Sequence, residues 1–139
     1  MPLQRRVKKI KHKSTKTLHK KAWDLQSQWV RRSQADENGL VFCYTCGHKF
    51  HWKEMDLGHY IHKDCLDFDL IGLKPQCTGC NRFRHGNQGI FAEKLIAEFG
   101  EEAIAELRAR SQVVKKFTVQ ELEDLITLYT QRLLEMEGR

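Results

Sequence analysis

The chain has 139 residues, of which 40% are hydrophobic and 30% are charged, and this fits one domain with a modest core. No apolar run approaches the roughly 20 residues needed to cross a bilayer, and the N-terminus lacks the apolar core of a secretory signal. We therefore expect a soluble, cytoplasmic protein without a membrane partner. In such a reducing compartment the five cysteines are expected to be metal ligands or single thiols rather than disulfides.

Positive charge is concentrated at the N-terminus. The formal net charge is +6, and residues 1–21 hold nine of the 24 basic residues and no acidic residue. Residues 22–139 are left with 15 basic and 18 acidic side chains. This distribution predicts a basic arm over residues 1–21 that contacts the phosphates of a nucleic acid. The predicted contacts in the arm are Arg5, Arg6, Lys8, Lys9, Lys11 and Lys13.

Apolar spacing predicts a first helix over residues 17–33, because Leu18, Ala22, Leu25 and Trp29 recur at intervals of four, three and four. The turn residues that end at Gly39 are expected to end this helix. Residues 40–42 then have the pattern of a short strand. The centre of the chain, from 40 to 80, is rich in turn residues and lacks a helical period, so it needs something other than a large core to hold it.

The C-terminal third has the pattern of helices. Gly100 provides a stop after one amphipathic face, and Thr118 with Glu121 forms a capping box before the longest apolar stripe. We expect helices over residues 101–137 and a single domain over 22–139. The apolar positions of the helix before Gly100 are Phe91, Leu95 and Phe99, and those of the later helices are Ala103, Ile104, Leu107, Leu122, Leu125, Ile126, Tyr129, Leu133 and Met136.

Two CxxC pairs, Cys43 with Cys46 and Cys77 with Cys80, are separated by thirty residues. Two such turns can complete a tetrahedral site with four sulfur ligands, which predicts a structural zinc ion. A strand before the first pair and a helix after the second favour a treble-clef fold over residues 40–99. The overall class is then α+β and mostly helical, with flanking N- and C-terminal helices. Buried cysteines without metal and an iron–sulfur cluster are the alternatives.

Polar residues between and after the CxxC pairs are candidates for catalysis, since a closed four-sulfur site leaves no open position on the zinc. His59 is the candidate general base. Asn81, at the predicted start of a helix, and His85, four residues later, could face one divalent ion. Arg82 and Arg84 could contact phosphate. The alternatives are a structural His59, a capping Asn81 and solvated arginines.

Several of these residues together resemble the phage NinG family, the Rap recombination nucleases of lambdoid phages, which belong with the HNH or treble-clef nucleases. The matching order begins at the first CxxC pair and covers about residues 40 to 130. Its elements are Cys43, Cys46, Asp56-Leu57-Gly58-His59-Tyr60, Phe68-Asp69, Gln76-Cys77-Thr78-Gly79-Cys80-Asn81, Gly86-Asn87, Leu95-Ile96 and Gly100-Glu101-Glu102-Ala103.

The resemblance implies a structure-specific endonuclease that cuts branched DNA such as Holliday junctions and D-loops, requires Mg²⁺ or Mn²⁺ and acts as a homodimer. It implies no small-molecule substrate. The implied catalytic residues are His59 as base, with Asp56, Asn81, and His85 or Asn87 around the catalytic ion. Nucleases of this class commonly carry an acidic ligand immediately before the base. Here that position is Gly58, and Asp56, two residues earlier on the same strand face, is expected to take the role.

Two other functions remain open from the sequence. A catalytically inactive, zinc-dependent module that binds branched DNA would explain the arm and the cysteines equally well. A sequence-specific HNH endonuclease would share the chemistry but would usually need a separate reader domain. The helix from Leu122 to Met136 could contact a second subunit or pack onto its own domain.

Overall fold

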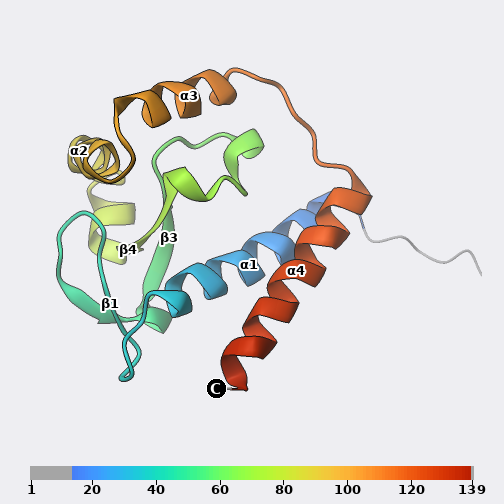
Figure 1. Ribbon diagram of the computed structural model, residues 1–139, viewed down its shortest axis with the longest axis horizontal. Helices are drawn as coiled ribbons and strands as arrows, with labels where there is room; N and C mark the ends of the chain where they lie inside the picture. The colour runs from blue at the N-terminus through green and yellow to red at the C-terminus, as the bar shows by residue number, and fades with distance from the viewer. Residues whose placement is uncertain (1–13, 139) are drawn as a thin grey trace, which may run out of the picture.

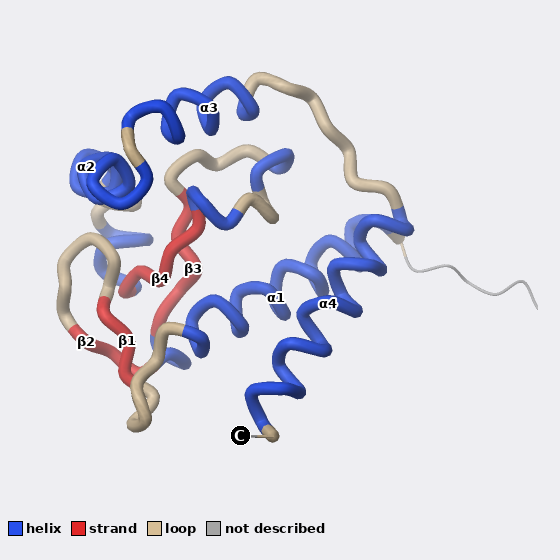
Figure 2. The backbone as a smooth tube through the Cα atoms, in the orientation of Figure 1, coloured by secondary structure: helices blue, strands red, loops and turns tan. Residues whose placement is uncertain are grey.

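The computed structural model describes residues 14–138, and the elements within this range mix helices with short strands, as the sequence predicts (Figures 1 and 2). Helices predominate. The basic residues of the predicted arm from Arg5 to Lys13 lie outside the described residues. The helices are α1 (Thr15–Ser33), α2 (Gln88–Phe99), α3 (Glu101–Ser111) and α4 (Val119–Glu137), and the strands are β1 (Leu40–Phe42), β2 (Lys49–His51), β3 (Met55–His59) and β4 (Leu73–Cys77).

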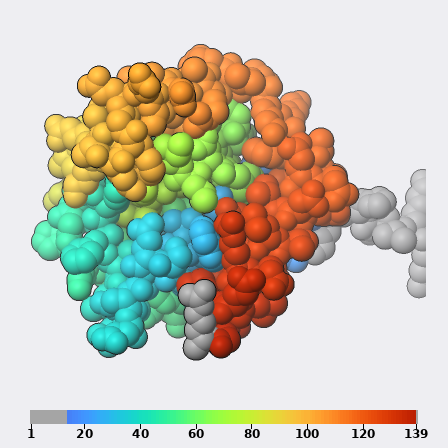
Figure 3. Space-filling model, in the orientation of Figure 1, coloured from blue at the N-terminus to red at the C-terminus, as the bar shows by residue number. Residues whose placement is uncertain are grey.

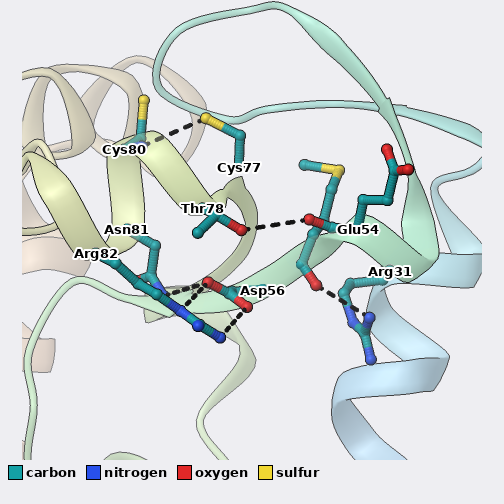
Figure 4. Close-up of polar contacts among 9 residues, drawn as sticks. Arg31, Glu54, Asp56, Cys77, Thr78, Cys80, Asn81 and Arg82 are labelled. Atoms are coloured by element: carbon teal, nitrogen blue, oxygen red, sulfur yellow. Dashed lines mark hydrogen bonds and ion pairs between the residues drawn. The ribbon is translucent and has the colours of Figure 1, made fainter.

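Helix α1 begins two residues before the expected position, because Ser14 caps it. The Ser14 hydroxyl accepts a hydrogen bond from the backbone N–H of Thr17 at 3.2 Å, which satisfies one of the free donors of the first turn. Near its other end, the Arg31 guanidinium donates to the carbonyls of Trp52 and Met55 at 2.8 and 3.0 Å. These bonds fix α1 to the start of β3 (Figure 4).

The strands form two antiparallel pairs, β1 with β2 and β3 with β4. In the second pair, Met55 is opposite Cys77 and His59 is opposite Leu73. Side chains alternate between the two faces of a strand, so His59 shares a face with Leu57, while Asp56 points to the other face. Leu57 packs in a buried cluster with Val30 of α1 and Leu73 of β4, with Trp23 and Trp29 of α1 packed against it. The face of β3 that carries His59 is therefore the face covered by α1.

The helix expected to continue from Cys80 is interrupted. Residues Gly79–Phe83 form a single π-helical turn, η4, in which the Arg84 N–H donates to the Gly79 carbonyl at 3.0 Å. The chain then leaves the helix, since His85 and Asn87 have φ values of 51° and 49°. Helix α2 begins only at Gln88. The prediction that His85 follows Asn81 by one helical turn is therefore wrong.

Helices α2 and α3 close one side of the molecule around a buried cluster of Phe91, Leu95 and Ile104. Tyr44 and Tyr60 pack against this cluster from the strand region. Gly100, at φ 90°, joins the two helices in a conformation that favours glycine. The cluster holds α2 and α3 together, and an ion pair between Lys74 of β4 and Glu98 of α2 at 3.0 Å links α2 to the strands.

Helix α4 packs along α1 (Figures 1 and 3). The predicted capping box forms, because the Thr118 hydroxyl accepts from the Glu121 N–H and the Glu121 carboxylate accepts from the Thr118 N–H. Leu122 and Leu133 are buried against the domain. The sequence left open whether this helix packs onto its own domain or contacts a second subunit. The structure shows that it packs onto its own chain. Within residues 14–138, no helix is long and apolar enough to cross a membrane.

Candidate functional site

The four cysteines of the CxxC pairs converge on one point. Their sulfurs all lie within 4.8 Å of one another, and Cys46 Sγ and Cys77 Sγ are 3.8 Å apart. A tetrahedron with zinc–sulfur bonds of about 2.3 Å has sulfur–sulfur edges of about 3.8 Å. Cys43 follows β1, Cys77 ends β4 and Cys80 lies in η4, so the cluster joins three separate parts of the chain. The arrangement fits a metal ion such as zinc.

Local hydrogen bonds favour a thiolate at Cys43. Burial alone would raise the pKa of Cys43, but the backbone N–H groups of Cys46 and Cys77 and the side chain of Thr45 outweigh burial and lower it. Burial raises the pKa of Cys77, and the neighbouring sulfurs of Cys80 and Cys43 raise it further. Four thiolates at this spacing would therefore need a bound cation to offset their mutual repulsion.

Asp56 and Asn81 lie in direct contact. The Asn81 side-chain amide donates to Asp56 Oδ2 at 3.0 Å (Figure 4). Arg82 also binds this carboxylate, through Nε to Oδ2 and a terminal nitrogen to Oδ1, each at 3.1 Å. Carboxylate and amide oxygens are ligands that suit Mg²⁺ or Mn²⁺, so this pair fits the donor set of such an ion. Binding of an ion to Asp56 would compete with Arg82, whose side chain is 66% exposed.

Gly58 is required by the side chain of Gln76. A Cβ atom at position 58 would lie 1.9 Å from Gln76 Oε1. Gln76 is fully buried, and its Nε2 donates to Thr45 Oγ1 at 3.1 Å and to the Gly86 carbonyl at 2.9 Å. These two bonds fix the amide in place. The acidic side chain expected beside a general base is therefore excluded at position 58 by packing.

His59 is held by a carboxylate that the sequence analysis did not select. His59 Nε2 lies 3.1 Å from Asp67 Oδ1, and His19 Nε2 lies 2.7 Å from Asp67 Oδ2. Trp23 stacks on the His59 ring with centroids 4.6 Å apart and planes 1° from parallel, and the His62 ring lies 4.8 Å away. His59 is thus positioned by α1 and by the loop that follows β3.

The hydrogen bonds of Asp67 keep it ionised. Burial would raise its pKa, but hydrogen bonds and charge interactions with His59 and His19 outweigh burial and lower the pKa below the ordinary aspartate value. An ionised carboxylate only accepts hydrogen bonds, so both imidazoles donate to it from Nε2. The Nδ1 atom of His59 is then the nitrogen that can accept a proton.

The other predicted site residues lie apart from His59. Asp56 points to the opposite face of β3, and His85 is exposed beyond the end of η4. The Asn87 side chain is directed at Cys80 Sγ, with 3.9 Å between nitrogen and sulfur. Arg84 is exposed. The structure therefore brings Asp56 together with Asn81, places Asn87 beside the cysteine cluster, and leaves His85 separate.

A family comparison bears on this arrangement. A model of the bacteriophage lambda NinG protein family matches residues 2–138. The chain belongs to the NinG family. No curated protein and no solved structure matches the chain.

The match confirms the family, NinG, that the sequence motifs indicated. The matched range includes the cysteine cluster, the Asp56–Asn81 contact and the Asp67–His59 pair. Of these, Asp67 and its second partner His19 were missed by sequence analysis. The only sequence signal for Asp67 is its position next to the Phe68-Asp69 pair, which is one of the motifs of the NinG resemblance. Nothing in the sequence links Asp67 to His19, which is 48 residues away.

Proposed function

We propose that this NinG-family chain is a divalent-metal-dependent endonuclease that cleaves branched recombination intermediates such as Holliday junctions and D-loops. The observation that carries the proposal is the Asp67–His59 pair. A histidine with one nitrogen bound to a carboxylate and the other able to accept a proton is suited to act as a general base. Family membership supports a role in phage recombination.

In this proposal, His59 Nδ1 accepts a proton from water as that water attacks the phosphorus of the DNA backbone. Asp67 holds the imidazole in the required tautomer and stabilises the imidazolium that forms. Trp23 restricts the rotation of the ring by stacking on it. The expected products carry a 5′ phosphate and a 3′ hydroxyl.

Asp56 and Asn81 would hold the catalytic Mg²⁺ or Mn²⁺, with His85 or Asn87 as further candidate ligands. When bound, such an ion stabilises negative charge on the phosphate and the leaving oxygen. Asp56 and His59 point to opposite faces of β3. A phosphate that is reached both by the ion at Asp56 and by the water at His59 must therefore lie across the free edge of β3, the edge that does not pair with β4. Arg82 and Arg84 would contact neighbouring phosphates.

We further propose that the cysteine cluster is a structural zinc site of the treble-clef type and that a homodimer cuts the two equivalent strands of a four-way junction. The zinc would connect β1, β4 and η4 without taking part in hydrolysis. A symmetric dimer would place one base at each of the two opposing strands.

Cleavage of an end-labelled four-way junction and of a linear duplex with the same arm sequences, in Mg²⁺ or Mn²⁺, tests this function. We expect cutting of the junction, little cutting of the duplex, and none when Mg²⁺ and Mn²⁺ are both left out. Asp56→Ala is expected to abolish cutting, whereas Asp124→Ala, on the exposed face of α4, is expected to retain it. Equal cutting of both substrates would contradict junction selectivity. Tight junction binding without cutting in either ion would identify an inactive binding module.

A further inference from the structure

A cavity of about 580 Å³ lies beside the Asp67–His59 pair, between the first turns of α1 and the segment that joins α3 to α4. His19, His59 and Asp67 line it. Its volume is in the range of sites for small ligands and is too small to admit a DNA duplex. Any base that enters it must therefore be unpaired.

Positive charge surrounds this cavity. Lys16 and Lys20 of α1 and Lys115 and Lys116 of the α3–α4 segment line it, against two aspartates, Asp64 and Asp67. Lys20 pairs with Asp24 at 2.8 Å and Lys115 with Glu121 at 2.9 Å. Among residues 14–138, no acidic side chain forms an ion pair with Lys16 or Lys116. Two ammonium groups are therefore left to bind phosphate.

The N-terminus of α1 adds to the positive charge around the cavity. Thr15 and Lys16 belong to its first turn and also line the cavity, and this turn contains no acidic residue. The helix has 19 residues, so the partial positive charge at its N-terminus is developed in full. Anions are stabilised at such a position.

Aromatic side chains supply the apolar part of the cavity. Trp23 and Phe117 both line it, and Phe117 lies with its ring centroid 5.8 Å from that of His19. His59 stacks on one face of Trp23. Phe117 packs edge-on against Phe68 and has Lys115 Nζ 5.0 Å from its ring centroid, so a base stacked on Phe117 would also lie beside an ammonium group. Lysines combined with aromatic rings are the means by which proteins bind single-stranded nucleic acid, because every unpaired base can stack.

We propose that this cavity binds an unpaired nucleotide of single-stranded DNA, with its phosphates at Lys16 and Lys116 and its base against Phe117. This inference rests on the proposed function and names the substrate feature that the site recognises. At a branch point, the cavity would hold the unpaired strand beside His59. The protein would locate the branch by this contact. Paired arms of a junction, in contrast, would contact only the outer surface.

The test is the affinity of the full-length chain for a fluorescein-labelled single-stranded dT oligonucleotide and for a duplex of equal length, measured by anisotropy in buffer without Mg²⁺ or Mn²⁺. The variant Lys16→Gln/Lys116→Gln removes two cavity charges. The control variant Lys53→Gln/Lys94→Gln removes two exposed charges outside both the cavity and the basic arm. Both variants have the same net charge, so general attraction to DNA falls equally in the two.

We expect the cavity variant to lose about tenfold or more in affinity for the single strand and little for the duplex. In a plot of log Kd against log salt concentration for the single strand, the slope should be smaller by about 1.4 in the cavity variant, because two phosphate contacts are lost. Phe117→Leu, which keeps an apolar side chain, should also lose about tenfold for the single strand only. Free dTMP and inorganic phosphate should compete weakly, because each makes only part of the contacts.

Equal losses in the cavity and control variants, or equal losses for duplex and single strand, would overturn the inference. Because binding is measured without Mg²⁺ or Mn²⁺, the result is separate from cleavage. Selective loss of single-strand binding in a chain that never cuts DNA would support the cavity and contradict the proposed nuclease. Junction cutting that the cavity variant retains in full, with control-like binding, would contradict the cavity alone.

Discussion

Gln76 determines which residue can stand at position 58. Its amide is held by Thr45 and by the Gly86 carbonyl, and its Oε1 occupies the space of a side chain at position 58. Oε1 is also a buried acceptor without a hydrogen-bond partner among the described residues. The amide therefore cannot move away without breaking two buried hydrogen bonds, each of which is costly to leave unmade.

Gly58→Ala is accordingly expected to lower the free energy of unfolding by about 1–3 kcal/mol, as overpacking of a buried site does. Urea denaturation with zinc present would measure this. Gly89→Ala is the matched control, since a Cβ there meets nothing within 4 Å and α2 gains a better helix former. A Gly58→Ala variant as stable as the control would show that Gln76 moves freely.

His62 makes stability depend on pH. Burial, followed by the charge of His59, lowers the pKa of His62, and the opposing effect of Asp67 is smaller. A histidine with a lowered pKa in the folded state stabilises the fold fully above its ordinary pKa of about 6.5, and this contribution is lost as pH falls through its folded pKa. His62→Gln should therefore show a shallower decline in unfolding free energy from pH 7 to pH 5 than the native chain. Parallel declines, measured by urea denaturation at each pH, would contradict this.

Residues close in sequence were predictable, and residues joined by tertiary packing were not. The CxxC spacing alone predicts which four cysteines converge, because each pair is a local turn. The link between His59, Asp67 and His19 depends on how α1 crosses β3, which no local pattern encodes. The predicted i, i+4 relation of Asn81 and His85 was wrong because positive φ values at His85 and Asn87 end the helix.

At the scale of elements, α1 and α4 form the main helix pair of the molecule. Tyr129 of α4 is buried, stacks near Trp29 with ring centroids 5.6 Å apart, and donates from its hydroxyl to Gln26 Oε1 at 3.3 Å. The apolar stripe of α4 was visible in the sequence, but its partner was not, since an amphipathic face packs equally well on its own domain or on a second chain. The buried Gln26 is the specific partner that the sequence did not reveal.

Neighbouring leucines of α4 provide a test of this packing. Leu133 is 8% exposed and Leu134 is 57% exposed. Leu133→Ala is expected to lower the unfolding free energy by about 2–5 kcal/mol, whereas Leu134→Ala should change it by about 0.5 kcal/mol or less. Thermal or urea denaturation would measure both. Equal effects, or a larger effect at Leu134, would indicate that α4 packs by its other face in solution.

For the molecule as a whole, the cysteine cluster lies within a small hydrophobic cluster that joins the two strand pairs through Val41 of β1 and Met55 of β3. The strand region has short strands and many turns, so its order depends on the cluster. Cys80→Ser is expected to reduce the zinc content below one ion per chain and to lower stability, because metal binding contributes directly to folding. Cys65→Ser, outside the cluster, should retain one zinc per chain. Equal zinc contents in the two variants, measured by elemental analysis, would contradict the site.

The most direct test of the account is junction cleavage by His59→Gln. Glutamine can still donate a hydrogen bond to Asp67, but it cannot accept a proton at neutral pH. We predict a loss of at least about 100-fold in the rate of cutting, with zinc content and junction affinity unchanged. A variant that cuts the junction at the native rate would show that His59 is not the base and would contradict the assignment of this site.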